Sequence, residues 1–252
     1  MKNYHTHTTR CYHASGTEEE YVLSAIKSGY TELGFSDHTP WHYNSRYHST
    51  MRMEEDKLSD YVDTLLNLKE KYKDKISIKI GLECEYFPDY MGWLRETINK
   101  YSIDYIILGN HFDKTDETGI YYGRPLNKQQ LTDYVDSCIE AMKTGLYSYL
   151  AHPDLANYDE NDEFYAQEMT RLCMAAKEMD IPLELNLLGF STKRHYPNVL
   201  FFVIAKKVGN RIIIGTDAHE SEALLDKDTY DKAYDFIHDF GLEFTEDIKF
   251  LR

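Results

Sequence analysis

The chain has 252 residues, of which 42% are hydrophobic and 28% are charged. That length and balance predict a globular protein with a core large enough for one domain over residues 1–252. Acidic side chains outnumber basic ones by 43 to 28, and the formal net charge is −15. Because broad nucleic-acid-binding surfaces are usually basic, this balance argues against nucleic acid as a partner. A small anionic substrate is compatible with it, since bound cations can reverse the charge of a site.

No run of eighteen apolar residues occurs, so we expect neither a transmembrane helix nor a membrane partner. A charged, histidine-rich segment starts directly after Met1, which leaves no room for a signal peptide. The four cysteines are widely spaced and form no Cys-x-x-Cys pair: Cys11, Cys84, Cys138 and Cys173. We therefore expect reduced thiols in a cytoplasmic protein rather than a disulfide framework.

Strand and helix patterns alternate along the chain. Strands are predicted at residues 2–7, 31–36, 76–85, 104–110, 146–151, 182–186 and 211–215. Helices are predicted at 18–28, 54–72, 88–100, 127–144, 163–179, 198–208 and 229–240. The clearest helix is 54–72, where Leu58, Val62, Leu65 and Leu66 recur at helical spacing among charged residues.

This alternation predicts an α/β fold with a parallel sheet. Right-handed crossovers in one direction close such a chain into a barrel at this length, and an open doubly wound sheet is the alternative. The sequence contains no Pro/Gly/Ser-rich linker and no internal repeat, which again favours a single domain.

Polar residues of the types that bind metals stand at the ends of the predicted strands. His5 and His7 are two positions apart on the first strand, so their side chains point to the same face. The later strands end in His38, Glu83, Glu85, His111, His152, Asp217 and His219. In a parallel barrel all these ends lie on one rim.

Each of these residues alone has an ordinary explanation as a turn, a surface group or a solvated strand end. Together, so many buried ionisable groups need a counter-charge, and metal ions supply one. Imidazole and carboxylate ligands without thiolate suit Zn²⁺, Fe or Mn²⁺, and the number of ligands predicts two or three ions with a bridging carboxylate. Which divalent metal is bound does not follow from the sequence.

The motifs follow one another in a recognisable order, namely His5-Thr6-His7 with His13, then Asp37-His38, Gly81-Leu82-Glu83, Gly109-Asn110-His111, Ala151-His152-Pro153-Asp154 and Gly215-Thr216-Asp217-Ala218-His219. This set resembles the PHP (polymerase and histidinol phosphatase) family and spans nearly the whole chain. The resemblance implies a distorted (β/α)₇ TIM-like barrel, in agreement with the seven predicted strands.

The resemblance also implies a set of metal ligands. One ion would be held by His5, His7, Glu83 and Asp217. Glu83 would bridge to a second ion on His111 and His152, with Glu85 as its rival on the same strand face. A third ion would be held by His13, His38 and His219. The neighbouring carboxylates Asp37, Asp113 and Asp154 could orient these histidines, although each also has an ordinary structural explanation.

The stretch Glu184-Leu185-Asn186-Leu187-Leu188-Gly189-Phe190 is similar to the histidinol-phosphatase branch of the family. This similarity implies hydrolysis of L-histidinol phosphate in histidine biosynthesis. Our hypothesis is attack by a metal-bridging hydroxide, with Asp217 holding the ions, Arg194 clamping the phosphate and His195 protonating the leaving group. The segments 41–53 and 121–124 are expected to line the substrate side of the rim.

Two other functions compete with this hypothesis. The chain could be a PHP phosphoesterase for another small phosphate ester or a nucleotide, or a non-catalytic metal-binding module. Retention of all the matched ligand positions argues against the last of these. The sequence does not determine the substrate, the general acid or the oligomeric state.

Overall fold

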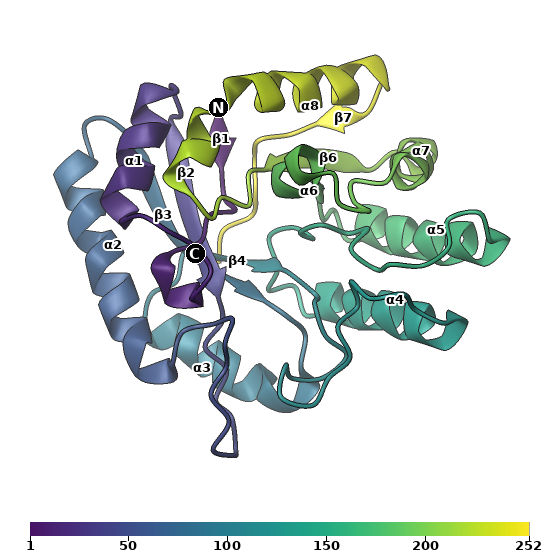
Figure 1. Ribbon diagram of the computed structural model, residues 1–252, viewed down its shortest axis with the longest axis horizontal. Helices are drawn as coiled ribbons and strands as arrows, with labels where there is room; N and C mark the ends of the chain where they lie inside the picture. Colours follow the sequence, from purple (N-terminus) through teal and green to yellow (C-terminus); the bar gives the residue numbers. More distant parts are fainter. Residues whose placement is uncertain (252) are drawn as a thin grey trace.

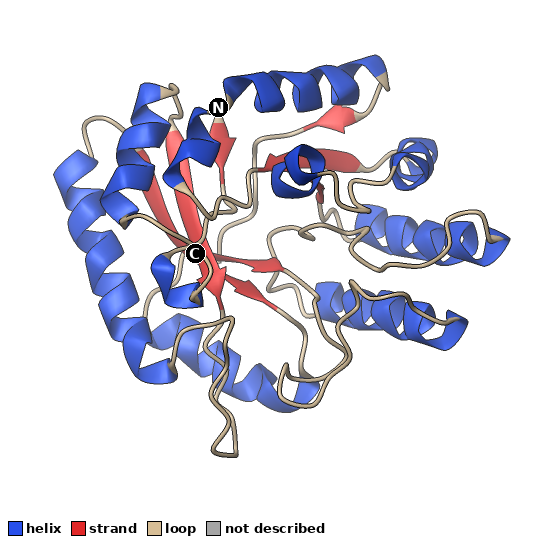
Figure 2. Ribbon diagram, in the orientation of Figure 1, coloured by secondary structure: helices blue, strands red, loops and turns tan. Residues whose placement is uncertain are grey.

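Parallel strands occupy the centre of the molecule, and helices surround them (Figures 1 and 2). The computed structural model describes residues 1–251; Arg252, the last residue of the predicted domain, lies outside them. Within this range the strands are β1 Lys2–Asn3, β2 Glu32–His38, β3 Ser77–Cys84, β4 Tyr105–Leu108, β5 Leu183–Asn186, β6 Arg211–Gly215 and β7 Glu243–Phe244. The helices are α1 Glu18–Lys27, α2 Leu58–Tyr72, α3 Met91–Lys100, α4 Lys128–Lys143, α5 Glu163–Glu178, α6 Leu187–Thr192, α7 Val199–Val208 and α8 Lys227–Asp239.

The strands form two parallel sheets that are joined at both edges. One has the order β1-β2-β3-β4 and the other β5-β6-β7. Leu150 pairs in parallel with both Leu108 and Leu183, which connects β4 to β5. Thr6 pairs in parallel with Ala218, which connects the segment after β1 to the segment after β6. The predicted α/β barrel is therefore confirmed, and the open sheet is excluded.

Several predicted strands are shorter than expected, and the difference is largest at 146–151 and 2–7. In the segment 146–151, Leu150 alone forms bridges, although the amide of Leu108 also donates to the carbonyl of Tyr149 at 3.0 Å. The first strand ends at Asn3 instead of continuing to residue 7. The side chain of Asn3 explains this early end, because it donates to the Thr6 hydroxyl at 2.8 Å and accepts from the Thr216 amide at 2.9 Å. The side chain of Asn3 thus forms hydrogen bonds in place of those that the backbone of a neighbouring strand would otherwise make.

Local sequence signals explain where helices begin and which faces they bury. Thr17 and Glu20 form a reciprocal capping box at the start of α1. Helix α2 buries Leu58, Val62 and Leu65 against the sheet, but Leu66 is 48% exposed. The predicted helix is confirmed, and Leu66 lies outside its buried face.

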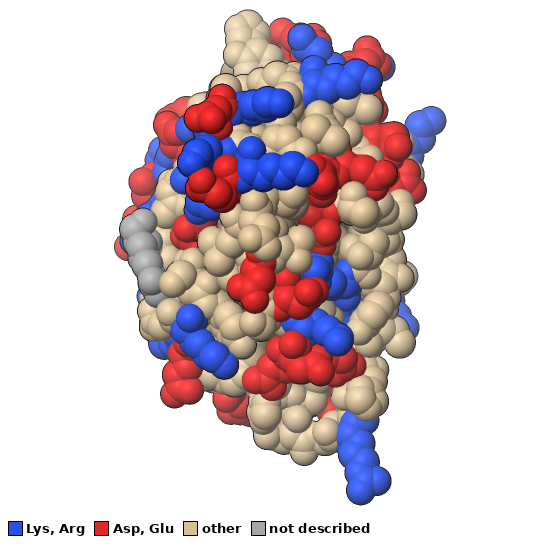
Figure 3. Space-filling view, turned by 90° about the vertical axis from the view of Figure 1, so that its left-hand side faces the viewer, with Lys and Arg blue, Asp and Glu red and all other residues tan. Residues whose placement is uncertain are grey.

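The outer faces of α1 and α2 are charged. On this side of the molecule, acidic and basic side chains are interspersed (Figure 3). The Lys71 ammonium lies 2.5 Å from the Glu19 carboxylate, which links α2 to α1, and Arg10 pairs with Asp60 at 2.7 Å. No helix within residues 1–251 is long and apolar enough to cross a membrane.

The interior contains two apolar clusters. The larger one fills the space between the helices and the sheet. The smaller one is formed by residues in or next to the strands, namely Tyr4, Tyr105, Ile107, Tyr149, Ala151 and Ile213. Ile248 and Phe250 of the C-terminal segment pack against it. This segment runs from β7 across the barrel (Figure 1) and is fixed where the Leu251 amide donates to the carbonyl of Asp104 at 2.8 Å. Neither β7 nor α6 was predicted, because each is very short.

Candidate metal centre

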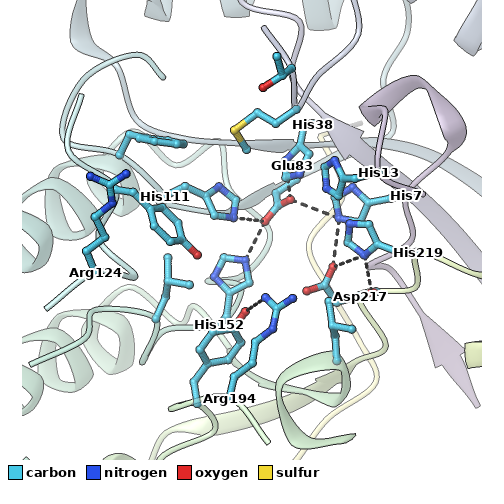
Figure 4. Close-up of a pocket in the computed structure, with 17 residues that line it drawn as sticks. His7, His13, His38, Glu83, His111, Arg124, His152, Arg194, Asp217 and His219 are labelled. Carbon is cyan, nitrogen blue, oxygen red and sulfur yellow. Dashed lines mark hydrogen bonds and ion pairs between the residues drawn. The ribbon is translucent and has the colours of Figure 1, made fainter. Parts of the chain in front are cut away.

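A cavity of about 650 Å³ opens where the strands of the barrel end (Figure 4). Most of the predicted ligands line it, namely His7, His13, His38, Glu83, His111, His152, Asp217 and His219. His5 lies just behind them and is fully buried. The barrel thus brings all nine predicted ligands to one rim.

Glu83 is the centre of this cluster. Its Oε1 lies 2.9 Å from His152 Nε2 and 3.4 Å from His111 Nε2. Its Oε2 lies 2.9 Å from His38 Nδ1 and 3.4 Å from His7 Nε2. A Cβ atom at Gly109 would lie 2.0 Å from the Glu83 carboxylate, so glycine at that position makes room for it. His5 Nε2 also lies 3.6 Å from Glu83 Oε1. One carboxylate that faces five histidines has the arrangement expected of a bridging ligand.

Asp217 forms a second centre. Its Oδ1 lies 3.1 Å from His7 Nε2, 3.4 Å from His5 Nε2 and 3.5 Å from His219 Nδ1. The backbone of Asp217 has φ +51° and that of His152 has φ +29°. Left-handed backbone at residues other than glycine is strained and is often found at functional sites. Here it turns both side chains towards the cavity.

Buried carboxylates outside the cluster hold its histidines. Glu184 Oε1 lies 2.8 Å from His5 Nδ1, and Glu184 Oε2 accepts the His152 amide at 2.9 Å. Asp37 Oδ1 lies 3.6 Å from His7 Nδ1. Contacts of this kind fix the orientation of metal-binding histidines. Sequence reasoning missed Glu184, although a charged residue between Leu183 and Leu185 in a buried strand was a usable signal.

Glu85, the rival of Glu83, has different partners. Its carboxylate is paired with the fully buried Arg52 at 2.8 Å and accepts from the Trp41 indole at 2.9 Å. It also lies 3.2 Å from His111 Nδ1. The guanidinium of Arg52 lowers the pKa of Glu85 against the opposing effect of burial. Glu85 therefore supports His111 from outside the cluster, and Glu83 remains the predicted bridge.

The donor atoms of the cluster fit divalent cations. In the described part of the chain, seven of them are buried without a hydrogen-bond partner, namely His5 Nε2, both ring nitrogens of His7, His38 Nδ1, Glu83 Oε2, His152 Nδ1 and His219 Nε2. Leaving buried polar atoms unpaired costs free energy. Sets of donor atoms that lie within 4.8 Å of one another include His5-His7-Glu83, His5-His152-Asp217 and His7-His38-His219.

The charges of these groups also suit cations. Burial would raise the pKa values of Glu83 and Asp217, but the surrounding histidines hold both well below their usual range. Burial lowers the pKa of His38 to about 4 and that of His219 to about 3. Ionised carboxylates and neutral imidazoles are the forms that bind metal. For His5 and His7, the nearby carboxylates overcome the effect of burial and raise the pKa.

Of the two residues predicted to act on the substrate, Arg194 lies in the cavity and His195 does not. Arg194 lines the cavity, points into it between His152 and Asp217 (Figure 4), and donates to the Tyr196 hydroxyl at 2.7 Å. His195 lies outside this cavity, and its Nε2 is 2.7 Å from the carbonyl of Leu155. The structure therefore does not bring His195 to the metal ligands. This position does not fit its predicted role as the general acid.

The remaining predicted residues have mostly structural contacts. Asp113 accepts the amide of Ile120 at 2.6 Å, and Asp154 accepts the amide of Asn198. Burial raises the pKa of Asp154 to about 7. From the two segments expected on the rim, four residues line the cavity, namely Thr50, Met51, Tyr121 and Arg124.

Comparisons with known proteins place the chain in a family. The family model described as PHP domain matches residues 3–187. A protein of Deinococcus radiodurans named "Probable histidinol-phosphatase" is 26% identical over 230 residues, which cover 86% of this chain and 85% of the relative. The histidinol-phosphatase of Lactococcus lactis is 25% identical over 240 residues, covering 86% and 83%. The crystal structure of that organism's histidinol phosphate phosphatase, a complex with zinc, L-histidinol and phosphate, superposes with a TM-score of 0.76 at 20% identity over 100% of this chain and 98% of that one.

Proposed function

Because the chain belongs to the PHP domain family, we propose that it is a metal-dependent phosphomonoesterase that converts L-histidinol phosphate and water into L-histidinol and phosphate. The observation that carries this proposal is the cluster of buried imidazoles and carboxylates around Glu83 and Asp217, with unpaired donor atoms beside a cavity. The size of the cavity suits a small ester.

Two or three divalent ions would be held by the predicted ligands. His5, His7, Glu83 and Asp217 form the first set, Glu83 with His111 and His152 the second, and His13, His38 and His219 the third. When bound, such ions lower the pKa of coordinated water and neutralise the charge of a phosphate group.

The chain's own residues bind and orient the ester. Arg194 offers two or more N–H donors to phosphate oxygens in a fixed plane, and its bond to Tyr196 limits the directions it can take. Met51, Leu155 and Leu188 give the cavity an apolar wall against which the organic part of the substrate packs. Glu184 and Glu85 hold His5 and His111 from behind, so that these ligands keep one orientation.

The test combines elemental analysis of the freshly purified protein with phosphate release from histidinol phosphate and from a panel of small esters. We expect two to three ions per chain and selective turnover of histidinol phosphate. Metal-loaded protein that releases no phosphate from any ester would contradict the proposal. Turnover of a different ester would support the proposed phosphatase activity and contradict histidinol phosphate as the substrate.

One observation favours a second candidate, a small phosphate ester with another anionic group. Arg124 lines the outer edge of the cavity, and within residues 1–251 its side chain makes no ion pair or hydrogen bond. The acidic residues of the cavity wall, Glu83 and Asp217, both belong to the metal cluster. A second anionic group would therefore find a partner in Arg124. The ester panel should include such compounds, and Arg124→Ala should impair their turnover selectively.

A further inference from the structure

Cys11 differs from the other three cysteines in its surroundings. All four side chains are buried as free thiols. Cys84, Cys138 and Cys173 belong to the large hydrophobic cluster, as is usual for a buried thiol that acts as a small apolar group. Cys11 is fully buried, yet it belongs to neither hydrophobic cluster of the described chain. Its burial therefore needs another explanation.

The neighbours of Cys11 are metal-binding groups. Its Sγ and one ring nitrogen each from His13 and His219 lie within 4.8 Å of one another. It also belongs to a second set of this kind with His7 and Asp37. Both ring nitrogens of His7, which is 1% exposed, lack a hydrogen-bond partner. The thiol thus lies among imidazoles that have unpaired donor atoms.

The backbone brings Cys11 and His13 together. Cys11 ends the short 3₁₀ helix Thr9–Cys11, and the next residue, Tyr12, has φ +66°. This left-handed turn folds the chain back, so that His13 Nδ1 lies 2.6 Å from the carbonyl of Cys11. The turn directs the side chains on both sides of Tyr12 to the same place.

We propose that the Cys11 thiolate is a ligand of the ion held by His13 and His219. This inference rests on the metal centre described under Proposed function, but not on its substrate. Donor atoms that share one tetrahedral zinc ion are about 3.3–3.8 Å apart, from bond lengths of about 2.0–2.3 Å. The three donors need only small side-chain movements to reach that spacing. His38, predicted from the sequence to complete this set, has a donor atom within 4.8 Å of His7 and His219, and its Nδ1 lies 2.9 Å from Glu83 Oε2. The thiolate would therefore add a ligand to the set without replacing His38.

A thiolate changes which metal the third position prefers. Thiolate ligands select Zn²⁺ or Co²⁺ over Mn²⁺ and Mg²⁺, which prefer oxygen. The ions at Glu83 and Asp217 have imidazole and carboxylate ligands, so they tolerate a wider range of metals. The centre then contains one thiophilic position beside a less selective pair.

The test uses the full chain, stripped of metal with a chelator and reconstituted with Co²⁺. A thiolate bound to Co²⁺ produces a sulfur-to-cobalt charge-transfer band in the near ultraviolet, which imidazole and carboxylate ligands do not. We expect this band in the unmodified protein and its loss in Cys11→Ser and Cys11→Ala. Cys173→Ala removes a buried thiol from the hydrophobic core and should retain the band.

Two outcomes would overturn the assignment. One is a fully Co²⁺-loaded unmodified protein without the band, which needs no variant and therefore decides the matter even if the Cys11 variants fail to fold. The other is a band that persists in Cys11→Ala. Phosphate release is measured on the same samples. A Cys11-dependent band without turnover of histidinol phosphate would contradict the proposed substrate but support Cys11 as a metal ligand. Turnover of histidinol phosphate without the band would support the substrate and contradict Cys11 as a ligand.

Discussion

The two ends of the barrel interior are built on opposite principles. At the end where the strands begin, aromatic and aliphatic side chains pack together, and the Tyr105 hydroxyl donates to the carbonyls of Tyr4 and Phe35 at 2.8 and 3.1 Å. At the other end, histidines and carboxylates are equally buried but leave donor atoms unpaired. In the small hydrophobic cluster that defines the lower end, the Tyr149 hydroxyl is the one buried side-chain polar atom of the described residues that lacks a hydrogen-bond partner. In the metal cluster that defines the upper end, seven donor atoms lack a partner, so the upper end needs a ligand far more than the lower end does.

The change between these ends takes place within a few residues of the same strands. Tyr105 and Ile107 point inward at the lower end, and the next inward position, Gly109, makes room for Glu83. Ile213 is followed in the same way by Gly215, where a Cβ atom would lie 1.7 Å from the Glu184 carboxylate. Buried charge without a counter-ion is costly. The upper end should therefore depend on ions, and the lower end should not.

The largest effect is expected from Asp217→Asn, which removes a carboxylate shared by three histidines. We expect loss of bound metal and a fall in kcat of more than about 10²–10³-fold, the range seen when one group that stabilises a transition state is deleted. Elemental analysis and phosphate release measure both quantities. Asp247→Asn is the matched control, because Asp247 pairs with Lys2 on the surface near the lower end. Full metal content in Asp217→Asn would show that our ligand assignment is wrong.

Metal removal should destabilise the protein. A ligand present at about 1,000 times its Kd stabilises the folded state by about 4 kcal/mol, which for a chain of this size corresponds to a Tm shift of about 10 °C. Scanning calorimetry with and without a chelator measures this shift. A Tm that does not change on complete removal of metal would contradict the contrast between the two ends.

Glu184→Gln should weaken metal binding by about 10–100-fold, because an amide holds the His5 ring less firmly than a carboxylate does. Titration of the metal-free protein with Zn²⁺ measures the affinity. Glu168→Gln replaces another buried glutamate, one that pairs with Arg171 away from the cluster, and should bind zinc normally. Equal affinities in both variants would remove Glu184 from the centre.

Arg194→Ala should raise KM or lower kcat so that kcat/KM falls by about 10-fold or more, since a charge-assisted hydrogen bond contributes about 1.5–3 kcal/mol. Metal content should stay unchanged, which separates this variant from the ligand variants. Arg171→Ala is a control for the loss of a guanidinium elsewhere. An unchanged kcat/KM for the true substrate would exclude Arg194 from the site.

The smallest effect on the centre is expected from Phe250→Ala at the lower end. Phe250 is partly buried and packs edge-on against Tyr4 and Tyr105, with ring centroids 6.0 and 6.3 Å away. Its truncation should cost about 1–2 kcal/mol of unfolding free energy and leave the number of bound ions unchanged. Urea denaturation and elemental analysis measure the two quantities. Loss of metal in this variant would mean that the two ends are coupled.

The metal ligands of the upper end could be predicted from the sequence more completely than the residues that hold those ligands in place. Histidines and carboxylates at strand ends are visible as a pattern, so the nine ligands could be named and the structure gathers them. Arg52 lies in an irregular loop, and its pairing with Glu85 depends on tertiary contacts that no local spacing encodes. Cys11 was treated with the other cysteines because thiols look alike until their neighbours are known.

The predicted strand boundaries were wrong where side-chain hydrogen bonds or single β-bridges replace the regular backbone pairing of a sheet. The side-chain amide of Asn3 ends β1 by forming hydrogen bonds in place of the backbone. The segment 146–151 completes the barrel through the bridges of Leu150 alone. Hydrophobic periodicity reports which residues are buried, but it does not report which hydrogen bonds a strand makes. His195 shows the same limit, because its chemical type suited the predicted role and its position does not.

The bridge between Thr6 and Ala218 has a consequence for how the protein is made. It places His5 and His7, which follow β1, against Asp217 and His219, which follow β6. During synthesis the growing chain therefore exposes the first histidines long before their carboxylate partner leaves the ribosome. An ion held by residues from both segments would therefore bind only after the barrel has closed. Once bound, the ion links segments separated by nearly the whole chain, and such long-range links restrict the unfolded state most.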